Sequence, residues 1–196
     1  MFARTDRLLL RPGWREDAPA LYAAIAEEGI VRNLATAPWP YSMADAEAFL
    51  AIERPADTPS FLLFRRTRGA PQLVGGAGLG RDPGGPVELG YWIARPFWGL
   101  GYATEAAEAV IRIARDTLRL DKLVAAHVTD NPASGRVLEK VGFKPTGQYA
   151  KRYSAGRRAM VSRKLFEFDL SGSEVAAEED VADAAMSFEK AFCLAA

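Results

Sequence analysis

The chain is poor in cysteine, has no long apolar run and carries no net charge. Cys193 is the single cysteine among 196 residues, so no intrachain disulfide is possible. No apolar run approaches the roughly 20 residues that a membrane helix needs, and the start, MFARTDRLLLRP, is not apolar enough for a signal peptide. A formal net charge of zero argues against a general nucleic-acid binder. We expect a cytoplasmic protein that binds neither membranes nor nucleic acid.

The hydrophobic content, 49%, is high enough for one well-buried core. Residues 171–196 hold six acidic side chains and one lysine, so residues 1–170 carry a net charge of +5. We therefore expect a domain over 1–170 and an acidic helical tail over 171–196. Val181, Ala185, Phe188 and Phe192 recur in the tail at helical spacing. This stripe would dock on its own domain or on a second copy, which leaves a monomer or a homodimer open.

The apolar pattern predicts helices and strands in an α/β (α+β) fold. Strand-like runs cover 7–11, 60–66, 72–79, 87–94, 123–128, a segment from 143 onward and 160–170. Helical patterns cover 17–29, 42–52, 104–118 and 131–141. We expect Asp17, a Ser42–Asp45 capping box and Asn131 to cap three of these helices, and Gly142 to stop the last. The connectors among the strands of 60–94 are short and rich in turn formers, which favours an antiparallel meander. A basic loop with Lys151, Arg152, Arg157 and Arg158 is expected between the last two strands.

The stretch RPFWGLGYATEA, 95–106, joins a predicted strand to a predicted helix. Gly99 and Gly101 precede the expected helix start, where backbone can adopt positive φ and approach a ligand closely. The first N–H groups of a helix are unpaired and carry the positive end of its dipole. The stretch therefore predicts a binding site for a phosphate or pyrophosphate.

Two common phosphate sites do not fit this stretch. A P-loop needs Gly-Lys followed by Ser or Thr, and the sequence has no such tripeptide. A dinucleotide fingerprint needs glycine where Thr104 stands, and Asp130 lies too far along the chain to be its acid. The second glycine group, GGAGLG at 75–80, lies inside a strand pattern and is followed by a turn, so we do not expect it to bind phosphate.

WGLGYATEA followed by NPASGRVLEKVGF resembles the GNAT superfamily of N-acetyltransferases, and TDRLLLRP with ELGYWI resembles its ribosomal-protein N-terminal (alanine) acetyltransferases. The resemblance covers 4–170 and implies a mixed, largely antiparallel central sheet flanked by helices, with acetyl-CoA as co-substrate and no metal. It implies that backbone of the 89–93 strand and Asn131 hold the pantetheine arm, and that the loop from Trp98 holds the pyrophosphate. The implied cofactor-binding residues are Leu89, Tyr91, Trp92, Ile93, Trp98, Gly99, Leu100, Gly101, Tyr102, Ala103, Thr104 and Asn131. The family often has Gln or Arg in place of Trp98.

Two residues are candidates for the chemistry. In much of the superfamily a tyrosine seven residues after the asparagine is the acid, but here Leu138 occupies that position. In the ribosomal-protein branch a serine three residues after it is the candidate, and Ser134 matches; otherwise it is an ordinary first-turn serine. Glu88 opens the strand expected to hold pantetheine and is our candidate base; the alternative is a solvated strand-end glutamate. His127 lies in a buried-looking strand and is expected to be a core residue.

We therefore expect direct acetyl transfer to a primary amine, since Cys193 lies in the tail and no acyl-cysteine route is expected. A carboxylate base suits a protein or peptide N-terminal α-amine, or a weakly basic small-molecule amine, better than lysine. A non-catalytic acyl-CoA-binding or sensor protein of the same fold is the alternative, and a nucleotide-binding oxidoreductase is more distant.

Overall fold

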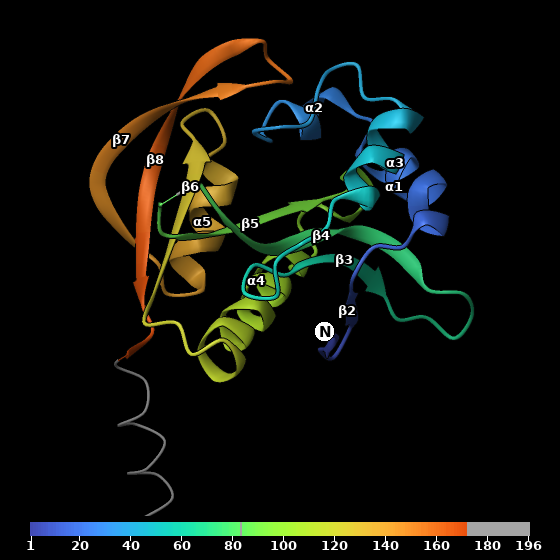
Figure 1. The fold of residues 1–196 in the computed structure, drawn as a ribbon, viewed down its shortest axis with the longest axis horizontal. Coiled ribbons are helices and arrows are strands. Elements are labelled where there is room, and N and C mark those ends of the chain that lie inside the picture. Colours follow the sequence, from blue (N-terminus) through green and yellow to red (C-terminus); the bar gives the residue numbers. More distant parts are fainter. Residues whose placement is uncertain (83, 172–196) are drawn as a thin grey trace, which may run out of the picture.

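In the computed structural model, which describes residues 1–82 and 84–171, eight strands form one sheet in the order β1-β2-β3-β4-β5-β6-β8-β7 (Figure 1). Neighbours pair antiparallel except β5 and β6, which are parallel. The strands are β1 (Ala3–Arg4), β2 (Leu8–Arg11), β3 (Ser60–Arg65), β4 (Gln72–Arg81), β5 (Val87–Ile93), β6 (Lys122–Val128), β7 (Lys144–Ser154) and β8 (Ala159–Asp169). The predicted mixed, largely antiparallel sheet is confirmed, including the meander β3-β4-β5.

Helices cover both faces of the sheet. They are α1 (Ala18–Ile25), α2 (Glu28–Val31), α3 (Met43–Ala51), α4 (Tyr102–Arg112) and α5 (Pro132–Lys140), with short turns at Arg15–Asp17, Arg95–Phe97 and Ile113–Thr117. Ser42 and Asp45 form the capping box expected at the start of α3. Asn131 caps α5, and Gly142 follows it with a φ of 96°, as the sequence predicts.

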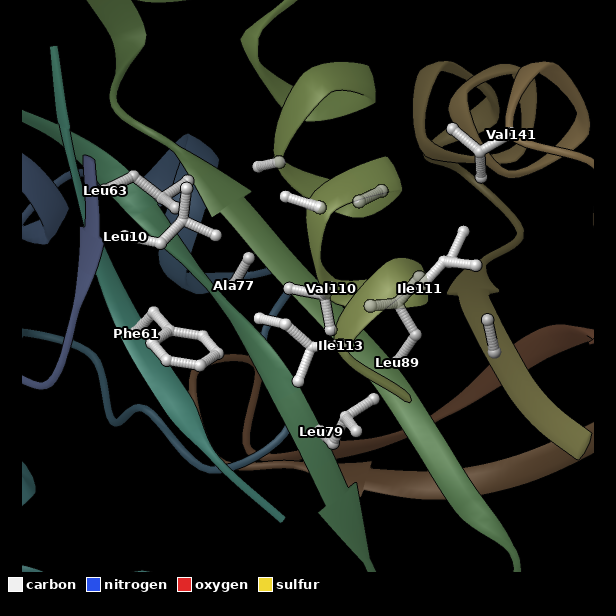
Figure 2. Close-up of a cluster of buried hydrophobic side chains, with 14 of the residues drawn as sticks. Leu10, Phe61, Leu63, Ala77, Leu79, Leu89, Val110, Ile111, Ile113 and Val141 are labelled. Atoms are coloured by element: carbon white, nitrogen blue, oxygen red, sulfur yellow. The ribbon is translucent and has the colours of Figure 1, made fainter. Parts of the chain in front are cut away.

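Strand β3 shows why both faces are buried. Phe61 and Leu63 point into the larger core, shared with α4 and α5, while Leu62 and Phe64 point into the smaller one beneath α1–α3. Successive strand residues alternate between faces, so the apolar run SFLLF fills two cores at once. Figure 2 shows the larger core, in which Val110 and Ile113 meet Leu79 and Leu89 of the meander. We name the two sides of the sheet the α4 face and the α1 face.

Several predicted boundaries are wrong. The first helix was expected to reach Gly29, but α1 ends at Ile25, where Ala26 leaves helical geometry with ψ 57°. In one straight helix Ile25 and Ile30 would point roughly 140° apart. The break lets both side chains reach the smaller core, where they are 5% and 3% exposed. Asp17 precedes α1 as expected, but its carboxylate binds Arg11 and makes no side-chain cap.

The helix expected over 104–118 begins earlier and changes its turn. Helix α4 starts at Tyr102, and Ile113–Thr117 continues it as a π turn in which Leu118 N–H donates to Ile113 C=O at 3.0 Å. Lys151 and Arg152 lie within β7, not in the loop that follows it. The predicted C-terminal tail, with Cys193, lies outside the described residues apart from Ser171.

Candidate active site

The sheet opens between its two parallel strands. Strands β5 and β6 pair at just two positions, Glu88 with Val124 and Leu89 with Ala125, although β5 continues to Ile93 and β6 to Val128. A cavity of about 520 Å³ occupies this region and is lined by residues of both strands, α4, α5, β7, β8 and the segment 29–35. Beyond Leu89, the edge of β5 that faces β6 has no described strand beside it and can pair with an extended ligand, except at Ile93 C=O, which accepts from the Trp98 indole.

The turn before α4 has the geometry predicted for an anion site. Gly99 and Gly101 have φ values of 76° and 81°, and Gly101 is the N-cap residue of α4. The first intrahelical bond is that of Glu105 N–H to Gly101 C=O, at 3.2 Å. No described residue accepts a hydrogen bond from the N–H groups of the six residues Gly99, Leu100, Gly101, Tyr102, Ala103 and Thr104. Six unpaired donors at one helix N-terminus form a site suited to a pyrophosphate.

Trp98, where the family often has Gln or Arg, fastens this turn to β5. Its indole N–H donates to Ile93 C=O at 2.6 Å, and the Arg95 guanidinium lies over its ring at 4.5 Å. The indole therefore holds the end of β5 and the start of the turn together, while the backbone donors that follow stay unpaired.

The N-terminal segment that contains Thr5 and Arg7 also contacts the turn before α4. Arg7 Nη1 donates to Leu100 C=O at 2.9 Å, and its Nε donates to Glu105 in the first turn of α4 at 2.6 Å. Glu105 also accepts from Arg7 N–H and from the Thr5 hydroxyl. Burial acts to raise the pKa of Glu105, but these hydrogen bonds outweigh it and hold the pKa below its usual value. Sequence reasoning missed this contact, because its partners lie 98 residues apart.

Ser134 lies in the first turn of α5, on the α4 face of the opening. Its N–H donates to Asn131 Oδ1 at 3.4 Å, so Asn131 is a helix cap at the cavity wall. The Tyr91 hydroxyl lies 3.0 Å from Ser134 Oγ and donates to Ser134 C=O at 2.9 Å. Burial raises the pKa of Tyr91 to about 12, although its bond with Ser134 acts in the other direction. Both residues line the cavity.

Glu88 lies on the other face, because Leu89 and Tyr91 of the same strand point toward α4 and α5. Its carboxylate accepts from Arg163 Nη1 at 2.8 Å and from Arg152 Nη1 at 3.4 Å, and Arg152 also binds Asp82. Its side chain is 27% exposed. Glu88 is therefore neither a solvated strand-end residue nor a free carboxylate, because two arginines hold its side chain at the cavity wall.

The cavity brings together the predicted site residues with one exception. Its lining includes the catalytic candidates Glu88 and Ser134 and every predicted cofactor residue except Leu100, which is 52% exposed. The lining also includes Arg152 and Arg163, which sequence reasoning did not assign to the site because their partner lies 64 and 75 residues away. His127 is 9% exposed, with Nδ1 2.8 Å from Val128 C=O and its ring against Phe166.

Within 1–82 and 84–171, no three side chains of His, Cys, Asp or Glu gather to hold a metal ion. The helices described in that part of the chain are also too short or too polar to cross a membrane.

Comparison with known families decides the class of this site. A family model described as the acetyltransferase (GNAT) domain matches residues 7–144. The chain belongs to the GNAT acetyltransferase family. As a GNAT protein it is an acetyltransferase enzyme, and the resemblance seen in the motifs is confirmed.

Relatives of this GNAT enzyme include characterised and uncharacterised proteins. It is 29% identical over 150 residues to the uncharacterized N-acetyltransferase YoaA of Bacillus subtilis, covering 73% of this chain and 82% of the relative. It is 37% identical over 65 residues to the ribosomal protein uS5-alanine N-acetyltransferase of Escherichia coli, covering 33% of each.

Solved structures share its fold. A GNAT-family acetyltransferase from Bacillus anthracis superimposes with a TM-score of 0.73 at 21% identity, covering 87% of this chain and 99% of that one. RimL, a ribosomal alpha-N-protein acetyltransferase in complex with coenzyme A, superimposes with a TM-score of 0.67 at 16% identity, covering 88% and 100%.

Proposed function

We propose that this GNAT enzyme transfers an acetyl group directly from acetyl-CoA to a primary amine. One observation carries the proposal: six unpaired N–H groups precede and open α4, and five of their residues, all except Leu100, line the same cavity as the open edge of β5. A pyrophosphate and an amide-containing arm are the two chemical features of acetyl-CoA that such a site would bind. The CoA-bound structure of RimL, which has the same fold, supports this choice.

The protein would hold acetyl-CoA, the acetyl donor, on the α4 face of the sheet. On the open edge of β5, the backbone of Leu89 and Tyr91 and the N–H of Ile93 would pair with the pantetheine amides, with Asn131 beside them. The backbone of Trp92 faces β4, so Trp92 would line the site through its side chain. The turn from Trp98 to Thr104 would hold the pyrophosphate. A helix N-terminus contributes about 0.3–1 kcal/mol to anion binding when exposed and about 2 kcal/mol when partly buried. The turn therefore orients the donor, while the pantetheine contacts supply further affinity.

The two catalytic candidates would act on opposite faces of β5. The amine nitrogen attacks the thioester carbonyl, a C–N bond forms, and the C–S bond breaks as the thiolate leaves. Ser134 would donate a hydrogen bond to the departing sulfur. Glu88 would accept the amine proton directly or through water. Its two arginine partners fix the position of its carboxylate at the cavity wall.

A carboxylate as the base favours an acceptor that loses its proton easily. At pH about 7, deprotonating an α-amine of pKa about 7.8 costs about 1 kcal/mol, whereas a lysine of pKa about 10.4 costs about 4.6 kcal/mol. We therefore propose a protein or peptide N-terminal α-amine, or a weakly basic small-molecule amine, as the acceptor. Sequence similarity to the uS5-alanine N-acetyltransferase supports the peptide α-amine.

An amine panel tests the proposal. Acetyl transfer would be followed by mass spectrometry with three acceptors: a peptide with a free α-amine and no lysine, the same peptide blocked at its α-amine and carrying one lysine, and small primary amines. We expect transfer to the free α-amine or to a small amine. Transfer to lysine alone would contradict the acceptor assignment. Tight binding of acetyl-CoA with no transfer to any amine would favour a non-catalytic sensor.

A further inference from the structure

Tyr91 reaches from the middle of β5 to the start of α5, where its hydroxyl contacts Ser134. Its hydroxyl lies 3.0 Å from Ser134 Oγ and 2.9 Å from Ser134 C=O, between residues 43 positions apart in the chain. Ser134 N–H is held by Asn131, so its side chain, N–H and C=O all have named partners. This leaves the Ser134 hydroxyl little freedom of position at the cavity wall.

The hydrogens in this contact can be assigned by elimination. A carbonyl oxygen cannot donate, so the Tyr91 O–H supplies the 2.9 Å bond to Ser134 C=O. The Ser134 hydroxyl is then the donor across the 3.0 Å contact to Tyr91 Oη. When a negative sulfur forms nearby, the serine hydrogen can rotate toward it. Ser134 Oγ is then free to accept the Tyr91 hydrogen, so the phenol has an acceptor in either arrangement.

We infer that Tyr91 is a positioning residue that holds the Ser134 hydroxyl and strengthens its hydrogen bond to the departing thiolate, an inference that rests on the proposed acetyl transfer. In a series of hydrogen bonds from the phenol through the serine hydroxyl to the sulfur, each bond polarises the next donor and strengthens its hydrogen bond. No bond forms or breaks at Tyr91, and its proton stays on the phenol. A phenol whose pKa is raised to about 12 remains protonated near neutral pH, as a permanent donor requires.

A double-mutant cycle tests this role. Turnover would be measured for the wild type, Tyr91→Phe, Ser134→Ala and the double variant, with acetyl-CoA affinity measured separately. We expect Tyr91→Phe to lower kcat about tenfold and Ser134→Ala to lower it about 100-fold, with acetyl-CoA affinity within about twofold of wild type. The double variant should match Ser134→Ala within about twofold, because the phenol acts through the serine. Tyr149→Phe, at a 63% exposed tyrosine, is the control and should match wild type.

Other results would overturn the role in recognisable ways. Equal kcat in Tyr91→Phe and wild type would overturn it while leaving acetyl transfer standing. A double variant about 1000-fold slower than wild type would show that Tyr91 acts on substrate independently of Ser134. If wild type acetylates no amine, the proposed function fails first and this inference fails with it.

A second measurement applies if Tyr91→Phe does not fold. Difluorotyrosine introduced site-specifically at position 91 keeps the side-chain shape and is a stronger donor. It should change kcat at least about twofold when Ser134 is present and leave Ser134→Ala unchanged. An equal response in both backgrounds, or none in either, would overturn the inference.

Discussion

At the scale of single residues, Gly101 tests the donor site most directly. Its φ of 81° lies in the left-handed region, where a Cβ costs about 1–2 kcal/mol, and a Cβ there would lie 3.4 Å from Arg7 Nη2. Relaxing that strain would turn the N–H groups of the turn away from the pyrophosphate. We expect Gly101→Ala to weaken acetyl-CoA binding about tenfold in calorimetry.

Gly147→Ala is the matched control for this prediction. Gly147 has a φ of 77°, its Cβ would meet no atom within 4 Å, and it does not line the cavity. The Gly147→Ala variant should therefore have a lower unfolding free energy than wild type, through the same backbone penalty, and an unchanged affinity for acetyl-CoA. Equal affinity in Gly101→Ala and wild type would contradict the anion site.

The substitution Glu88→Gln distinguishes a catalytic base from a residue that only forms structural ion pairs, because it keeps the shape of the side chain and removes its charge. If Glu88 accepts the amine proton, kcat/KM should fall at least about 100-fold while acetyl-CoA binds as in wild type. Asp82→Asn is the control, because Asp82 also binds Arg152 but does not line the cavity. It should retain kcat/KM within about twofold. A fully active Glu88→Gln would show that the carboxylate only orders the two arginines.

At the scale of elements, the Thr5–Arg7 segment is joined to α4 by a titratable contact. The pKa of Glu105 is lowered in the folded state, so its contribution to stability is present above the unfolded value of 4.5. That contribution is lost as pH falls through the folded pKa. We expect Glu105→Gln to lower the unfolding free energy by about 1 kcal/mol at pH 7, and the difference from wild type to shrink as the pH falls below 4.5. Urea unfolding over this pH range measures both.

The control for this contact is Glu108→Gln on the same helix. Glu108 is exposed, and no hydrogen bond or ion pair joins it to another described residue. It should leave the unfolding free energy within about 0.5 kcal/mol of wild type at each pH. A Glu105→Gln difference that does not change as the pH falls below 4.5 would show that the shape of the side chain, not its charge, makes the contact.

The elements that sequence predicted best are those specified by local patterns. The Ser42–Asp45 capping box, the Asn131 cap and the Gly142 stop involve residues within a few positions of one another, and each is confirmed. The break after Ile25 has no such signal, because it depends on which core Ile30 must reach. Contacts of Arg7 with Glu105 and of Glu88 with Arg163 join distant segments, and neither partner reveals the other in sequence.

At the scale of the whole molecule, the cavity exists because parallel β5 and β6 separate within an otherwise antiparallel sheet. The motifs at 98–104 and 131–134 predict which residues meet there, through their resemblance to a family. They do not predict that Glu88 and Ser134 lie on opposite faces, since that follows from strand alternation once β5 is placed between β4 and β6. The roles given to these residues remain predictions.

The division into a domain over 1–170 and a tail over 171–196 is the last prediction. Leu170 is 2% exposed, and its N–H donates to Asp121 C=O at 2.8 Å, so it is part of the core beside the start of β6. We expect a chain ending at Ser171 to keep its melting temperature within about 4 °C and its acetyl-CoA affinity within about twofold. Leu170→Ala in the full chain should instead cost about 2–5 kcal/mol of unfolding free energy. Light scattering of both chain lengths tests the homodimer. A dimer in the full chain and a monomer after truncation would support the tail as the dimer interface. The same oligomeric state in both chains would contradict that role of the tail.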